Sequence, residues 1–135
     1  MMENALHPTP DQIQDFLKAS CDDPVHMVNL LKFKAHATYK DGEDVSGETA
    51  YRRYAKAFAD YVRPHGCEAT YGGKLLASLI GDGNPQWDAV AIVKYPSAKI
   101  MIELTSSDAY RKIHRHRRAG LAGQLLLACD DTGIF

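Results

Sequence analysis

The stretch from residue 24 to residue 34 constrains the fold more than any other part of the chain. It reads Pro-Val-His-Met-Val-Asn-Leu-Leu-Lys-Phe-Lys, is rich in strand formers and follows two aspartates that favour a turn. Alternate residues of a strand point to opposite faces of a sheet, and here both faces are apolar at the centre. We therefore expect a strand in a sheet that is covered on both sides. Asn29 is the exception, because an amide on the more apolar face needs hydrogen-bond partners or a wet cavity.

Segments with regular hydrophobic spacing surround this strand in a definite order. In chain order they are a short helix at about 9–20, the strand at 24–34, a helix at about 47–62, strands at 68–80 and 87–95, a helix from about 96 to 119 that is split near 105–108, and a strand at 125–129. Residues 35–47 are polar and contain Asp41-Gly42, so we expect a loop that is either disordered or a cover over a site.

After the leading helix, the order strand, helix, strand, strand, helix, strand is the ferredoxin-like pattern. It predicts an α+β fold in which an antiparallel four-stranded sheet carries two helices on one face. Because the strands are apolar on both faces, we expect the uncovered face to be buried against a second copy, in a twofold homodimer. The 135 residues suit one domain with a sizeable core, and no repeat or linker divides them. We therefore predict a single domain over 1–135, with the helix at about 9–20 as an extension.

Composition and charge argue against several classes of protein. The net charge of −1 gives no general attraction to nucleic acid or anionic membrane, and the basic run at 111–118 spreads its charges around a helix. No apolar run is long enough to span a bilayer, and residues 1–10 lack the features of a secretory signal. Three cysteines without a CxxC pair favour a reduced, cytoplasmic setting. The six histidines show no ligand spacing, so we expect neither a metal nor a bound cofactor.

Candidate functional residues lie on the inward faces of the predicted elements. On a helix through Tyr110, Arg117 lies two turns further along the same side, so its guanidinium should face the sheet. A buried arginine needs an acid, backbone carbonyls or a bound anion. The sequence is consistent with two partners for Arg117: an acid of the chain, Asp88 or Asp108, or a bound anion. Five residues could line one pocket between sheet and helices: Asn29, Tyr54, Trp87, Tyr110 and Arg117. The alternative is a filled core in which their polar groups pair only with one another.

Several short pieces of the sequence resemble the DUF1330 family. They are Val-Asn-Leu-Leu-Lys-Phe-Lys at 28–34, Tyr-Arg-Arg-Tyr at 51–54, His-Gly at 65–66, Trp-Asp-Ala-Val at 87–90, Val-Lys-Tyr-Pro-Ser at 93–97, Tyr110, and His-Arg-Arg-Ala-Gly-Leu at 116–121. The resemblance covers residues 24–129 and implies a dimeric α/β barrel, similar to EthD-like proteins and small cofactor-free monooxygenases. It implies no reaction, because the family is functionally uncharacterised. The chain departs from the family pattern in the loop at 38–47 and at Gln124, where we would expect a basic residue.

Two classes of function are consistent with these residues. The first is a cofactor-free enzyme, monooxygenase- or isomerase-like, that acts on a small aromatic or carboxylated metabolite. Arg117 would then hold a negative charge, Asn29 and Tyr54 would orient the substrate, and His116 or Tyr110 would transfer protons. The alternative is a homodimer without catalysis, which either binds a ligand or is purely structural. A cavity beside Arg117 would argue against the purely structural case.

Overall fold

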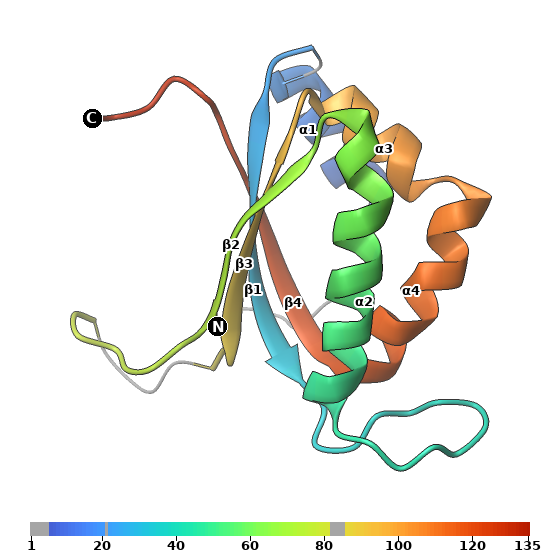
Figure 1. Cartoon of the computed structure of the whole chain (residues 1–135). Helices are drawn as coiled ribbons and strands as arrows, with labels where there is room; N and C mark the ends of the chain where they lie inside the picture. Colours follow the sequence, from blue (N-terminus) through green and yellow to red (C-terminus); the bar gives the residue numbers. More distant parts are fainter. Residues whose placement is uncertain (1–5, 21, 82–85) are drawn as a thin grey trace.

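The chain forms one four-stranded antiparallel sheet with helices packed against it (Figure 1). The computed structural model describes residues 6–20, 22–81 and 86–135; Cys21 and the beginning of the N-terminal segment lie outside this description. Its elements are α1 (Pro10–Ser20), β1 (Val25–Phe33), α2 (Gly47–Val62), the short 3-10 helix η1 (Arg63–His65), β2 (Glu68–Lys74), β3 (Ala89–Tyr95), α3 (Ala98–Thr105), α4 (Asp108–Gly120) and β4 (Leu121–Cys129). The strand order β2-β3-β1-β4, with antiparallel neighbours throughout, confirms the ferredoxin-like α+β prediction.

Local hydrogen bonds explain where the helices begin. Ser46, Ser97 and Ser107 cap α2, α3 and α4, and each side chain accepts a hydrogen bond from the backbone N–H three residues on. The Ser107 cap confirms the predicted split near 105–108. At α1, Thr9 and Gln12 exchange backbone-to-side-chain hydrogen bonds of 2.9 and 3.1 Å, which is a capping box.

The structure corrects the predicted bounds of two strands. β2 ends at Lys74, whose partner is the first residue of β3, Ala89, and one further backbone hydrogen bond, from the Leu75 N–H to the Asp88 carbonyl (2.9 Å), follows the ladder. Residues 76–80 leave the sheet as an extended arm (Figure 1), on which three apolar side chains are more than nine-tenths exposed: Leu76, Leu79 and Ile80. β4 begins at Leu121, directly after α4 and four residues earlier than predicted. This earlier start makes Gln124 a strand residue opposite Leu31.

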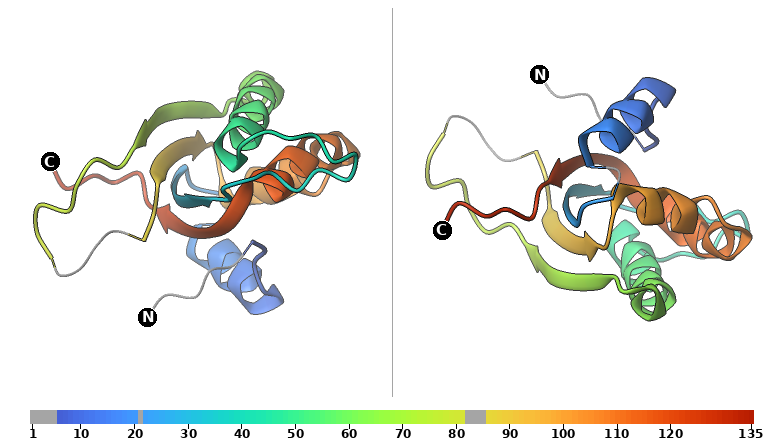
Figure 2. Two further views of the ribbon diagram at one scale, coloured as in Figure 1. Left: turned by 90° about the horizontal axis from the view of Figure 1, so that it is seen from below. Right: turned by 90° about the horizontal axis from the view of Figure 1, so that it is seen from above.

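The helices cover one face of the sheet. The side chains of Val25, Met27 and Leu31 on β1 are buried in the core on that face. Both views of Figure 2 show α2, α3 and α4 on the same side of the sheet, with the arm and the C-terminal tail on the other side. The predicted burial of the second face, here called the outer face, is therefore not provided by a helix or strand of the described chain.

Two glycines let the ends of α2 and α4 meet. Gly47 begins α2, Gly120 ends α4, and a methyl group at either position would overlap backbone atoms of the other glycine or of Lys34. Lys34 joins them, since its N–H donates to Gly120 (2.8 Å) and its carbonyl accepts from Gly47 (3.0 Å). This glycine crossing brings the two helices into backbone contact at one end of the sheet.

Candidate functional site

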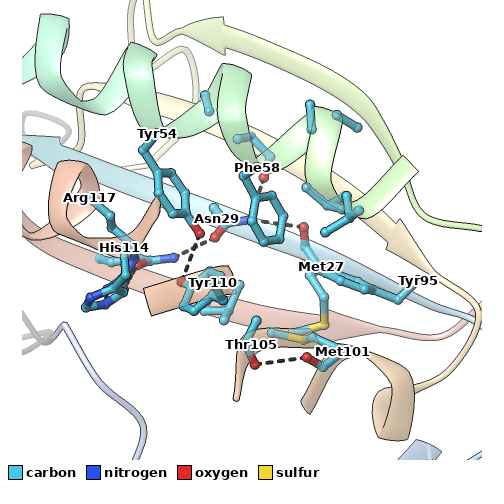
Figure 3. Close-up of a pocket in the computed structure, with 18 of the residues that line it drawn as sticks. Met27, Asn29, Tyr54, Phe58, Tyr95, Met101, Thr105, Tyr110, His114 and Arg117 are labelled. Carbon is cyan, nitrogen blue, oxygen red and sulfur yellow. Dashed lines mark hydrogen bonds between the residues drawn. The ribbon is translucent and has the colours of Figure 1, made fainter. Parts of the chain in front are cut away.

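A cavity of about 730 Å³ lies between the sheet and the helices. This volume falls within the range of roughly 300–1,000 Å³ that is typical of small-molecule sites. Figure 3 shows Arg117 and His114 at one end, Met27, Tyr95 and Met101 at the other, and aromatic rings between them. Four of the five residues predicted to share a pocket line this cavity: Asn29, Tyr54, Tyr110 and Arg117.

The fifth predicted residue, Trp87, does not line it. Trp87 borders a separate cavity of about 450 Å³, together with Lys34, Glu48 and Lys74. Its side chain is buried, and its indole Nε1 has no hydrogen-bond partner among the described residues. The prediction that Trp87 joins the other four is therefore wrong, because the residue precedes β3 and lies beyond the end of the ladder.

The middle of the cavity is aromatic. Tyr54 and Phe58 lie one turn apart on α2 and stack with ring centroids 5.4 Å apart, while the ring of Tyr110 meets both edge-on. The hydroxyls of Tyr54 and Tyr110 are 3.0 Å apart. Burial, followed by the neighbouring Tyr110, raises the pKa of Tyr54 well above its ordinary value of 10. Tyr54 therefore stays protonated at neutral pH, so it can form hydrogen bonds with a bound molecule but cannot deprotonate it.

Three neutral acceptors hold Arg117 at the polar end. Its guanidinium donates to the Leu6 carbonyl (2.7 Å), to Oε1 of Gln124, and to Nε2 of His114 (3.1 Å). Because Nε2 of His114 accepts this bond, that imidazole is neutral. Burial, followed by the charge of Arg117, lowers the pKa of His114 to about 4, which agrees with a neutral ring.

Neither acid that could have paired with Arg117 does so. Asp88 accepts from Lys32 and from a backbone N–H, and Asp108 accepts from Arg111. No carboxylate of the described residues forms a salt bridge with Arg117. The described residues that line the cavity include two arginines and no aspartate or glutamate. The charge of Arg117 is thus unanswered by an acid of the cavity wall.

Asn29 finds the partners that its position requires. Its Nδ2 donates to the carbonyls of Ala91 (3.0 Å) and Met27 (3.3 Å), and its Oδ1 accepts from Nε2 of Gln124 (2.5 Å). Since Gln124 in turn accepts from Arg117, one chain of hydrogen bonds crosses from β3 through β1 and β4 to α4. We call the pair Asn29 and Gln124 the amide relay. Sequence reasoning missed Gln124 as a site residue because it placed the start of the last strand too late.

His116, which we expected to transfer protons, does not line the cavity. Its Nδ1 lies 2.6 Å from the hydroxyl of Tyr39, and the two rings meet edge-on. Successive helical residues are turned by about 100°, so the neighbour of an inward-facing arginine points elsewhere. His116 therefore lies outside the cavity that the other candidate residues line, whereas His114 borders it.

The loop before α2 is neither disordered nor a cover over the cavity. Its Tyr39 ring lies under the guanidinium groups of Arg53 and Arg115, at 5.5 and 5.9 Å. Glu43 accepts two hydrogen bonds from Arg53, and Thr38 N–H donates to the Ala119 carbonyl (3.0 Å). These contacts fasten the loop to the outside of α2 and α4, and none of its residues lines the cavity.

Two further features bear on chemistry and location. Among residues 6–20, 22–81 and 86–135, no group of three or more His, Cys, Asp or Glu is arranged to hold a metal ion. Within the same ranges, the helices lack the combination of length and apolar character that crossing a membrane requires.

Solved structures of other proteins are similar to this chain over nearly its whole length. Two crystal structures of RPA0582, a protein of unknown function from Rhodopseudomonas palustris, are similar to the chain. The methylated form has 27% sequence identity, a TM-score of 0.86 and coverage of 98% of each chain; the other has 26% identity, a TM-score of 0.84 and coverage of 97% of this chain and 99% of that one. A Caulobacter crescentus CB15 protein named after the antibiotic biosynthesis monooxygenases shares the fold at 14% identity and a TM-score of 0.50, over 87% of this chain and 97% of its own.

Comparison of the sequence with curated proteins and with family models gives two different results. No curated protein is similar enough to the chain to count as a match. The model of the domain of unknown function DUF1330 matches residues 35–129, which is more than half of the chain. The matched residues include α2, α4 and Gln124, and so most of the cavity wall and the arginine at its polar end. The chain belongs to the DUF1330 family.

Proposed function

We propose that the chain binds a small organic anion with an aromatic or otherwise apolar body in the cavity between sheet and helices. The observation that carries this proposal is the charge of Arg117, which meets only neutral acceptors among the described residues, in a cavity wall where those residues include no acid. A partly buried cation without a counter-ion favours an anion that can supply one.

The two ends of the cavity suit the two parts of such a molecule. Arg117 and the hydroxyl pair of Tyr54 and Tyr110 would donate hydrogen bonds to the anionic head. The body would lie against Phe58 and the thioethers of Met27 and Met101, which adapt to irregular shapes. A ligand with a charged head and a flat apolar body would satisfy both ends.

A ligand panel tests this proposal. Benzoate and cyclohexanecarboxylate should raise the unfolding temperature, since a ligand at 100 times its Kd adds about 2.7 kcal/mol of stability. The neutral and cationic isosteres benzamide and benzylamine should not. Arg117→Met should remove the carboxylate response, whereas Arg118→Met, which deletes the exposed arginine next to it on α4, should retain it. Equal responses to benzoate and benzamide, or a full response in Arg117→Met, would refute the proposal.

A catalytic role is the second candidate, and the hydroxyl pair of Tyr54 and Tyr110 inside the cavity favours it. In this version the Tyr110 hydroxyl would give its proton to the carbon of a bound enolate and become a tyrosinate, and the tyrosinate would take a proton back from that carbon in the reverse step, while Arg117 stabilises the negative charge. Exchange of a ligand's acidic C–H for deuterium in heavy water would report such a step. Tyr110→Phe should then abolish exchange and retain binding. Exchange that persists unchanged in Tyr110→Phe would rule out this role.

We also propose that the chain forms a twofold homodimer through the outer face of the sheet. Cross-strand neighbours on this face are apolar: Leu30 lies opposite Val90 and Leu125, and Val28 lies opposite Ile92 and Leu127. Leu127 is 45% exposed in the single chain. A second copy that stacks the same face against this one would bury these side chains.

A further inference from the structure

We infer that the cavity selects singly charged anions over doubly charged ones, and that Gln124 sets this limit. The ligands in question are monocarboxylates, enolates and phenolates, as opposed to dicarboxylates and phosphate monoesters. This inference rests on the proposed function, because it concerns the same anion site and asks how many charges the site can answer.

The backbone dictates which way the amide relay points. The carbonyls of Ala91 and Met27 can only accept, so the Nδ2 of Asn29 must face them and its Oδ1 must face away. That oxygen accepts from Nε2 of Gln124, which leaves Oε1 of Gln124 toward Arg117. Turning the Gln124 amide around would set two oxygens against each other at Asn29 and two donors against each other at Arg117. Gln124 therefore shows an acceptor, and no donor, to the polar end of the cavity.

The remaining groups at that end supply one positive charge. His114 is neutral because its Nε2 accepts from Arg117. Arg111 lines the cavity, but its side chain is 77% exposed and bonded to Asp108 at 3.2 Å, so its charge is screened and shared. Tyr54 and Tyr110 donate hydrogen bonds without charge. Of the two arginines among the described residues that line the cavity, Arg117 is the one not paired with an acid.

Few hydrogen-bond donors are left over for a ligand. The three hydrogen bonds of Arg117 occupy both Nη2 protons and one Nη1 proton, so Nε–H and the second Nη1–H are left for a ligand. The tyrosine pair adds a hydroxyl donor. A second carboxylate on the ligand would lie against aromatic rings or methionine side chains, and the second charge of a phosphate monoester would meet no second unshared cation among the described residues; an unpaired charge is strongly disfavoured in either place.

Two substitutions at one position change the charge in opposite directions. Gln124→Glu keeps the size and the acceptor toward Arg117 but adds a carboxylate, so the cation becomes internally paired and the relay loses its donor to Asn29. Gln124→Lys adds a second cation beside Arg117. Gln124→Glu should weaken the binding of every anion, and Gln124→Lys should favour the binding of dianions.

Calorimetric titration of the full chain with benzoate, phthalate and phenyl phosphate, at a pH of about 8 where the last two carry two charges, tests the inference. The native chain should bind benzoate at least about tenfold more tightly than either dianion, which corresponds to roughly 1.4 kcal/mol. Gln124→Glu should lose at least about tenfold in benzoate affinity, and Gln124→Lys should gain as much for phthalate and phenyl phosphate. Urea unfolding of both variants checks that they are folded.

The outcomes separate the inference from the proposal beneath it. If the native chain binds none of the three anions, the proposed function fails. If it binds benzoate and phthalate equally, or if Gln124→Glu binds benzoate as the native chain does, the charge limit is wrong while the anion site stands.

Discussion

Replacing Arg117 with methionine should lower the free energy of unfolding by only about 1 kcal/mol or less. An arginine that neutralises a buried acid behaves differently, because its removal leaves that acid unpaired and costs roughly 3–5 kcal/mol. Since no carboxylate of the described residues forms a salt bridge with Arg117, the larger figure does not apply.

The smaller figure follows from the three hydrogen bonds that the substitution removes. Each contributes a net stability of roughly 0.5–1.5 kcal/mol, and an acceptor left buried and unpaired would cost about 1–3 kcal/mol. The acceptors on Leu6, Gln124 and His114 border a cavity of about 730 Å³, which has room for water to replace the guanidinium. Removing the cation also ends the cost of holding it without a counter-ion. These contributions oppose one another and leave a small net loss.

Urea unfolding followed by the fluorescence of Trp87, the single tryptophan, measures this loss. Trp87 is buried and does not line the cavity, so its signal reports global unfolding rather than the substitution itself. Arg118→Met, which removes an exposed arginine from the same helix, should change stability by less than about 0.5 kcal/mol. A loss of roughly 3 kcal/mol or more in Arg117→Met, with an unchanged slope of the unfolding free energy against urea concentration, would refute the reasoning. Such a result would indicate that Arg117 neutralises a buried acid.

Two other expectations concern pH and assembly. The pKa of His114 lies at about 4 in the fold, below its ordinary value of 6.5, chiefly because of burial and then because of Arg117. The unfolded chain therefore binds a proton more readily, so stability should fall as the pH drops from about 6.5 to about 4, and His114→Gln should flatten that slope; equal slopes in both proteins would contradict it. Light scattering after size-exclusion chromatography should give twice the chain mass of 15.0 kDa, and Leu127→Glu on the outer face should give the single mass. A native monomer at micromolar concentration would remove the dimer.

Periodicity was sufficient to predict most of the fold and part of the cavity wall. The helical spacing of α2 and α4 placed Tyr54, Tyr110 and Arg117 on inward faces, and alternation along β1 placed Asn29 beneath them. These patterns succeed because burial of apolar side chains selects the face that each element turns to the core. The serine caps succeed for a local reason, since they depend only on the next three residues.

The sequence predictions fail where contacts between residues far apart in the chain determine the structure. β4 begins directly after α4 because Leu121 pairs with Phe33, and the sequence near Leu121 does not indicate this contact. Gln124 could have been found from the requirement that Asn29 have a partner, but only after the register of β1 and β4 was known. The contact from Arg117 to the Leu6 carbonyl joins residues 111 positions apart and carries no sequence signal.

The glycine crossing divides the cavity into a part that resists change and a part that tolerates it. Arg117 lies three residues before Gly120, and Tyr51 lies four residues after Gly47, so the polar end of the cavity is attached to backbone that has no room to shift. The far end is formed by Met27, Met101 and the eight-residue helix α3, none of which takes part in the crossing. Members of a library varied at Met27 and Met101 would thus accept ligand bodies of different length while presenting each head group to the same guanidinium. Under the proposed anion binding, the crossing would let the preference for a head group and the preference for a ligand body be altered independently.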